Sequence, residues 1–229
     1  MTNKILRTVV MGSLTLLAFS NAAHADMKPY IEGQINYVNP DDVSTNTYSG
    51  TVSGITYTNT KIDFDFDSDT TMGFELGLSK IADSNFRLGF SYTKPSLDLD
   101  TSTLSGTITD GVTTVTGAVG ITAADYASVG LSFDNDVKTY MANVYYDFDA
   151  TENFKPFIGV GLGMSDIDNA EDKELTYSGM LGAKYYFSEQ AYLGGKFTYS
   201  TIDGPTDKLG LKYEDIDFYT STLSLGFEF

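Results

Sequence analysis

Apolar and polar residues alternate with a period of two through most of the chain beyond residue 26. In the first such run Ile31, Ile35 and Tyr37 share one face, and Glu32 and Gln34 share the other. Seven further runs repeat the alternation, at 72–79, 86–93, 140–148, 158–164, 177–187, 193–199 and 219–229. Runs of about ten alternating residues are typical of transmembrane β-strands. The pattern predicts an all-β fold, an eight-stranded antiparallel up-and-down transmembrane β-barrel.

The composition of the two faces indicates which one meets lipid. The polar faces are rich in Gly, Ser and Thr, which suit the narrow interior of a barrel of this size, so the apolar faces should point to hydrocarbon. Aromatic residues on the apolar faces also sort by depth, as in girdles at the two membrane interfaces. The expected girdles are Tyr37, Tyr92, Tyr140, Tyr177, Tyr199 and Tyr219 at one end, and Phe86, Phe148, Phe187, Phe227 and Phe229 at the other.

The connections between the runs are of two kinds. Short ones at 82–85, 149–153 and 188–190 predict periplasmic turns, and long ones at 38–71, 94–138, 165–174 and 200–215 predict extracellular loops. The first two long loops contain Thr- and Val-rich strands around turn residues. We expect hairpins there, Tyr48–Ser53 with Ile55–Thr60 around Gly54, and Thr103–Thr109 with Val112–Ala118 around Asp110-Gly111.

The first 25 residues have the features of a signal peptide. Lys4 and Arg7 precede an apolar core at 9–19, and Ala23-His24-Ala25 is a small-x-small cleavage pattern. We expect cleavage after Ala25 and a barrel domain at 26–229. The leader contains 2 of the 14 basic residues and none of the 31 acidic ones, so the mature charge would be −19. So acidic a chain is not expected to bind nucleic acid. Cysteine is absent, so no disulfide contributes to stability.

Two segments resemble a known group of proteins. Residues Tyr219, Leu223, Leu225, Phe227 and Phe229 resemble the C-terminal assembly signal of Gram-negative outer-membrane proteins, and Lys155–Gly163 resembles the Pro-aromatic-x-Gly-x-Gly strand of the OmpA-like, OmpX-like and opacity-type barrel superfamily. The resemblance runs from Lys28 to Phe229. It implies location in the outer membrane, contact with lipid and lipopolysaccharide, and the barrel assembly machinery as a partner during biogenesis. The superfamily includes anchors, adhesins, immune-evasion proteins and narrow channels, so the resemblance leaves the role open.

Six charged residues fall on the inward face. Because an unpaired buried charge costs several kcal/mol, we expect them to pair with one another. The pairing predicts an ion-pair network that plugs the lumen, further narrowed by Tyr30, Phe157 and Tyr186; a gated polar path for small ions is the less favoured alternative. The predicted network consists of Glu32, Glu75, Arg87, Lys184, Lys196 and Glu228.

Catalytic chemistry finds little support in the residue types. The single histidine is His24, in the predicted leader, so the mature chain would have neither His nor Cys as a general base or nucleophile. We expect no enzyme, no metal site and no cofactor. Asp65 opens an Asp-x-Asp-x-Asp pattern, but Thr70 replaces the glycine that a calcium loop requires. Solvation of the acidic 165–174 loop is favoured over diffuse binding of divalent cations between the protein and lipopolysaccharide.

Three hypotheses for function remain. The favoured one is a structural or surface-interaction role, in which a monomeric barrel presents loops whose strand edges capture a host or surface ligand by β-addition. The alternative is a narrow porin-like channel for small solutes or ions. A soluble protein of lipocalin type is the third.

Overall fold

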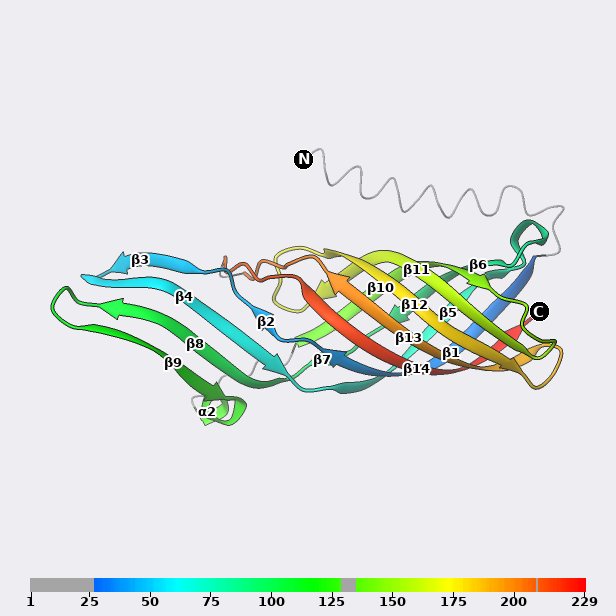
Figure 1. The fold of residues 1–229 in the computed structure, drawn as a ribbon, viewed down its shortest axis with the longest axis horizontal. Helices are drawn as coiled ribbons and strands as arrows, with labels where there is room; N and C mark the ends of the chain where they lie inside the picture. Colours follow the sequence, from blue (N-terminus) through cyan, green and yellow to red (C-terminus); the bar gives the residue numbers. More distant parts are fainter. Residues whose placement is uncertain (1–26, 129–134, 209) are drawn as a thin grey trace.

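The computed structural model describes residues 27–128, 135–208 and 210–229 (Figure 1). The predicted signal peptide and His24 lie outside the described residues. Within these ranges, helices are too short and too polar to cross a membrane.

Eight long strands form a closed antiparallel barrel, as the alternation predicts. Each strand pairs with the next one along the chain, and β14 pairs with β1 from Tyr30↔Glu228 to Pro40↔Phe218, which closes the barrel. The barrel strands are β1 (Lys28–Pro40), β5 (Asp69–Ser79), β6 (Phe86–Thr93), β10 (Asn135–Asp147), β11 (Phe154–Ile167), β12 (Glu174–Tyr186), β13 (Ala191–Ile202) and β14 (Ile216–Glu228).

The two faces of the barrel differ as predicted from the alternation. Apolar side chains point outward and are well exposed, with Met72 at 79% and Leu223 at 63%. Glu32 and Gln34 on the inward face of β1 are buried. Period-two side-chain geometry therefore separates an apolar surface from a polar interior.

The eleven predicted girdle residues all lie on the outer surface. At the loop end, ring pairs span neighbouring strands, with centroids 5.1 Å apart for Tyr92 and Tyr140. At the opposite end, Phe86 and Tyr146 are 5.3 Å apart. Tyr146 and Tyr185 are exposed at this end too, so the sorting of tyrosine to one interface and phenylalanine to the other is incomplete.

Short turns and long loops lie at opposite ends of the barrel. The turn end holds η2 (Ile81–Asp83), the connections at 148–153 and 187–190, and the C-terminus (Figure 1). At the loop end β7 (Ser96–Leu97) pairs with the start of β10. The arrangement agrees with the predicted periplasmic turns and longer extracellular loops.

The first two long loops form a single protruding sheet, which we call the loop sheet. The two predicted hairpins are confirmed: β3 (Tyr48–Val52) pairs with β4 (Ile55–Phe66), and β8 (Leu99–Thr109) pairs with β9 (Thr114–Thr122). In addition β4 pairs with β8, and β2 (Val43–Ser44) pairs with the C-terminal end of β4. The loop sheet extends the long axis of the barrel, and α2 (Ala123–Ser128) lies at its base (Figure 1).

An apolar cluster, the junction core, fills the space where the barrel meets the loop sheet. Phe66 and Tyr213 from two different loops pack against it. The inward face therefore changes from polar to apolar at the loop end of the strands, which the sequence analysis did not predict. The junction core consists of Val38, Val43, Leu97, Val137, Ile167, Ile202, Ile216 and Phe218.

Candidate functional site

An ion-pair network crosses the lumen in the half of the barrel nearer the turns. Arg87 from β6 lies between two carboxylates, with Nη1 3.4 Å from Glu75 Oε1 and Nε 3.4 Å from Asp147 Oδ2. Lys184 Nζ is 2.8 Å from Asp147 Oδ2, and Lys196 Nζ is 3.7 Å from Glu75 Oε2. Five strands thus contribute charges to one chain of contacts.

Glu75 lies at the centre of this network and is completely buried. Besides its two cations, the carboxylate accepts hydrogen bonds from Tyr30 Oη at 2.6 Å, Tyr145 Oη at 2.7 Å and Asn143 Nδ2 at 3.1 Å. A carboxylate removed from water needs such donors in addition to a counter-ion. Two cations and three hydrogen-bond donors therefore hold the Glu75 carboxylate in place.

Aromatic rings fill the remaining space around the network. The Arg87 guanidinium carbon lies 3.9 Å from the centroid of the Tyr145 ring and 5.0 Å from that of Phe157. These rings lie over glycines of neighbouring strands: a Cβ at Gly159 would approach Tyr145 Cδ1 to 2.4 Å, and one at Gly182 would approach Phe157 Cζ to 2.6 Å. The small inward residues therefore make room for the large ones.

The other two predicted network residues have different partners. Glu32 accepts hydrogen bonds from Gln34 Nε2 at 2.9 Å and Tyr192 Oη at 3.0 Å. Glu228 accepts hydrogen bonds from Ser79 and, at 3.1 Å, from Tyr186 Oη. Four of the six predicted residues are thus linked by ion pairs, and these two by hydrogen bonds.

Asp147 is the network member that the sequence analysis missed. It falls on the inward face of the run at 140–148, because Tyr146 and Phe148 on either side of it point outward. The alternation of inward and outward positions in this run was therefore the sequence signal that could have identified Asp147. Tyr145 and Tyr192 are inward for the same reason and were also missed, since the analysis assigned tyrosine mainly to the girdles.

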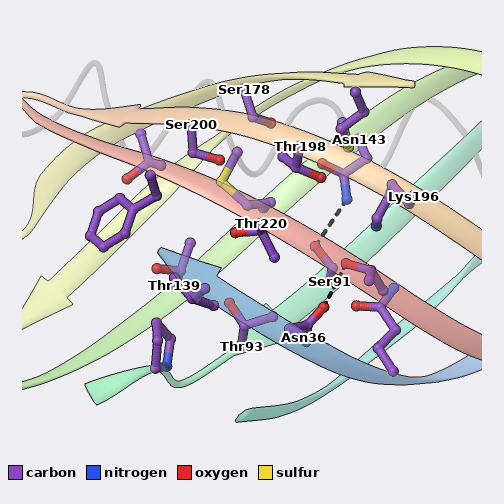
Figure 2. A pocket seen from close by; sticks show the side chains of 18 of the residues that line it. Asn36, Ser91, Thr93, Thr139, Asn143, Ser178, Lys196, Thr198, Ser200 and Thr220 are labelled. Carbon is purple, nitrogen blue, oxygen red and sulfur yellow. Dashed lines mark hydrogen bonds between the residues drawn. The ribbon is translucent and has the colours of Figure 1, made fainter. Parts of the chain in front are cut away.

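A cavity of about 90 Å³ lies between the network and the junction core. Figure 2 shows its hydroxyl and amide lining, in which Asn143 Nδ2 donates to Ser91 Oγ at 2.9 Å. Lys196 reaches it from the network side, and Ile202 and Phe218 line it on the junction-core side. Charged groups therefore border the cavity on one side and apolar groups on the other.

The two faces of the loop sheet have different chemistry. On one face threonines hydrogen-bond across strands, as in Thr107 with Thr116, whose hydroxyl oxygens are 2.9 Å apart. The other face is apolar and exposed, with Val115 at 64% and Val119 at 62%. Val112 at the tip is 93% exposed. This sheet therefore presents apolar surface that the described part of the chain does not cover.

The turn at the tip of the loop sheet is held by an aspartate. Asp110 Oδ1 accepts hydrogen bonds from the backbone N–H groups of Val112, at 2.8 Å, and Thr113, at 2.6 Å. These two donors lower the pKa of Asp110 below its ordinary value of 3.8. Gly111 supplies the positive φ of 86°, which glycine adopts without strain.

Acidic residues near the barrel rim are partly neutralised by lysines. Asp166 Oδ2 is 2.9 Å from Lys173 Nζ, and Asp168 Oδ1 is 3.2 Å from Lys138 Nζ. On β4, Asp63 accepts a hydrogen bond from a serine hydroxyl, which lowers the pKa of its carboxyl group. Across the described ranges, no group of three or more acidic or histidine side chains is placed to hold a metal ion.

Comparison with known proteins gives one family and several similar folds. The family model described as outer membrane protein beta-barrel domain matches residues 10–229, whereas no curated protein matches the chain. Neisserial surface protein A (NspA) is 11% identical with a TM-score of 0.52, over 88% of this chain and 97% of its own. OprG of Pseudomonas aeruginosa is 18% identical with a TM-score of 0.47, over 90% and 97%. OmpW of E. coli is 15% identical with a TM-score of 0.47, over 90% and 100%. At 11% identity, the likeness to NspA shows the fold alone.

Proposed function

This chain belongs to the outer membrane protein beta-barrel family, and from that premise we propose that it is a surface anchor whose loop sheet is the working part. The observation that carries the proposal is a five-stranded sheet with an exposed apolar face, mounted on a barrel whose lumen is crossed by a buried ion-pair network. Family membership supports location in the outer membrane of Gram-negative bacteria. The barrel then contacts lipid and lipopolysaccharide, and each copy is a monomer within its membrane.

The packing of the lumen supports a closed barrel. Arg87, Glu75 and Lys184 are almost entirely buried, and a hydrated path along the axis would have to pass between them. The junction core adds an apolar barrier at the loop end, which disfavours the entry of water and ions. Both barriers would have to open together for a solute to cross.

A narrow channel is the second candidate function, and the cavity below the junction core favours it. The two proposals are separated by conductance of the refolded protein in planar lipid bilayers. A closed anchor predicts no discrete conductance steps, and a channel predicts steps that change when Lys196, which lines the cavity, is replaced by Gln. Folding of each sample is checked by its mobility on a gel without boiling.

The residue types support a protein without catalytic activity. The described residues contain neither His nor Cys, and the buried carboxylates Glu75 and Asp147 are engaged by cations. A general base needs a free lone pair directed at a substrate. We therefore propose a binding role and not an enzymatic one.

Removal of the loop sheet tests the proposed function. Residues 41–68 and 95–134 would each be replaced by a short turn, which leaves the eight barrel strands intact. We expect the shortened barrel to fold and to insert into membranes, because the ion-pair network is unchanged, and we expect adherence of cells that display it to fall to the level of cells without the protein. Equal adherence of cells with the full and the shortened barrel would contradict the proposal.

A further inference from the structure

One edge of the loop sheet is unpaired and unusually open. Within the described residues β9 pairs with β8 on one side, and its other side has no strand partner. All but one of its residues are exposed. Figure 1 shows β9 along the outside of the loop sheet, on the side away from β3. An unpaired edge offers a row of backbone donors and acceptors to another strand.

The turn at the tip determines which backbone groups face outward. Asp110 N–H donates to the Thr113 carbonyl at 3.2 Å, so these two residues form a hydrogen-bonded pair. Hydrogen-bonded and non-hydrogen-bonded pairs alternate along an antiparallel ladder. It follows that alternate residues direct their N–H and C=O groups to the free edge, namely Thr114, Thr116, Ala118, Gly120 and Thr122. The N–H of Thr122, at the end of the strand, already donates to Asp125 Oδ2 at 3.0 Å.

Apart from Asp125, which binds the Thr122 N–H at its C-terminal end, the same edge lacks the features that commonly block pairing. Natural edge strands are usually protected by lysine, proline, a bulge or a charged residue. Residues 111–124 contain no charged residue and no proline, and the β8–β9 ladder is regular from Thr101↔Thr122 to Thr109↔Thr114. In a chain with 31 acidic residues, this neutral stretch keeps the centre of the contact free of charge, and Asp110 and Asp125 flank its two ends.

We propose that β9 pairs with β9 of a second copy of this chain, in antiparallel orientation and centred on Ala118. This inference rests on the proposed function, because it names the partner of the loop sheet. Centring on Ala118 aligns the outward backbone groups of both copies, Ala118 with Ala118, Thr116 with Gly120 and Thr114 with Thr122. Five hydrogen-bonded pairs with two bonds each would give ten backbone hydrogen bonds, and about eight remain because the Thr122 N–H of each copy is bound to Asp125.

This register also joins like faces of the two sheets. Opposed residues of an antiparallel pair point to the same face. Val115 of one copy then lies opposite Ile121 of the other, and Gly117 opposite Val119, so the two exposed apolar faces become one continuous surface. The threonine faces join in the same way on the reverse side.

The direction of β9 determines where the second copy is located. The chain rises from the barrel along β8 and returns toward it along β9 (Figure 1). Two copies in one membrane point the same way, so their β9 strands are parallel. An antiparallel partner has its barrel at the opposite end, in a membrane that faces the first one. The paired sheet therefore bridges two apposed membranes and holds cells or vesicles together.

The experiment uses two vesicle populations labelled with different dyes, each carrying the refolded full-length protein. Only samples in which protease reaches the loop sheet from outside are used. We expect the two dyes to co-cluster when both populations carry the protein, and not when one of them is bare. Clustering with bare vesicles would overturn the proposal, since the ligand would then be lipid, and so would the absence of clustering by correctly inserted protein.

Variants at the centre of β9 test the edge itself. Ala118→Pro removes an outward N–H that β8 does not use, and we expect clustering to fall to the level of protein-free vesicles. Ala118→Thr keeps the donor and suits a strand, so it should cluster like the wild type. If Ala118→Pro fails to fold, Thr116→Lys places a charge on the same edge, with the same expected loss. Clustering by folded Ala118→Pro or Thr116→Lys would overturn the pairing.

The two proposals fail in different ways. If homotypic clustering is absent but removal of the loop sheet still abolishes adherence of cells, the loop sheet remains the working surface and its partner is another molecule. If removal of the loop sheet changes neither adherence nor clustering, the proposed function fails as well.

Discussion

Replacement of Glu75 by glutamine tests whether the lumen is plugged. The change keeps the shape of the side chain and removes its charge. Arg87 and Lys196 then lose one carboxylate, and Asp147 alone remains to balance Arg87 and Lys184. The carboxylate of Glu75 accepts hydrogen bonds from Tyr30, Tyr145 and Asn143. The amide that replaces it brings an NH₂ group, which is a donor, into this set of donors.

The expected loss of stability follows from burial. Glu75 is 0% exposed and Arg87 2% exposed. Breaking a buried ion pair by removing one partner costs about 3–5 kcal/mol, because the remaining charge stays out of water. With a guanidinium m value of about 2–6 kcal/mol per molar, the unfolding midpoint of Glu75→Gln should fall by on the order of 1 M.

Glu32→Gln is the matched control. Glu32 lies directly opposite Glu75 in the register between β1 and β5, on the same inward face. It is hydrogen-bonded to Gln34 and Tyr192, and it forms no ion pair with any residue in the described ranges. Two like charges directly opposite each other on a sheet destabilise it. The loss of a charge at Glu32 therefore relieves repulsion, and we expect a change within about 1 kcal/mol.

Unfolding would be followed by the gel mobility of the folded barrel across a guanidinium series, because the chain has no tryptophan to report on folding. Equal and small changes for Glu75→Gln and Glu32→Gln, each below about 1 kcal/mol, would refute the argument. Such a result would mean that water reaches Glu75 and replaces the missing charge, as in an open pore.

Three further predictions concern other parts of the molecule. Gly226→Ala would place a Cβ 2.2 Å from a buried tyrosine ring, whereas Gly33 faces outward with nothing within 4 Å; guanidinium unfolding should show a loss of about 1–3 kcal/mol for Gly226→Ala and little change for Gly33→Ala. The lowered pKa of Asp110 stabilises the tip hairpin above pH 3.8, its ordinary value, and this contribution is lost as the pH falls through the lower folded value; an NMR titration in micelles that gives a value at or above 3.8 would contradict it. Leu223→Lys places a charge on the lipid face and should cost about 2–4 kcal/mol, whereas Thr116→Lys on the loop sheet should leave barrel stability unchanged in the same assay.

The sequence contained most of the information on the barrel and less on its interior. Alternation is a local property, and short turns make consecutive strands neighbours, so strand number and order followed from the chain alone. The parity of each run also placed Glu75, Arg87 and Lys184 inside. Contacts across the lumen depend on the stagger of all eight strands, so the hydrogen bond from Tyr192 on β13 to Glu32 on β1 could not be predicted from spacing.

The same limit applies to the loop end. Each hairpin follows from its own turn residues, but the pairing of β4 with β8 joins segments about 45 residues apart and includes an irregularity between Thr58 and Lys61. No local signal encodes such a contact. The junction core did leave a signal, since Val38 and Phe218 put apolar residues on the inward face at the ends of their strands. Those positions cap the lumen where the polar interior ends.

Membrane anchorage explains how a protein can keep an unprotected strand edge such as β9. A soluble protein with this edge could rotate freely and pair with its own copies, so selection favours lysine, proline or a bulge there. Copies in one membrane are held with their axes parallel, and their edges meet only in the parallel orientation, in which each pair is slightly less stable. The barrel thereby prevents antiparallel pairing among neighbours and leaves the edge available to a strand that arrives from outside the membrane. The proposed closed lumen fits the same reasoning, because a barrel braced by ion pairs across its interior holds the loop sheet in a fixed orientation.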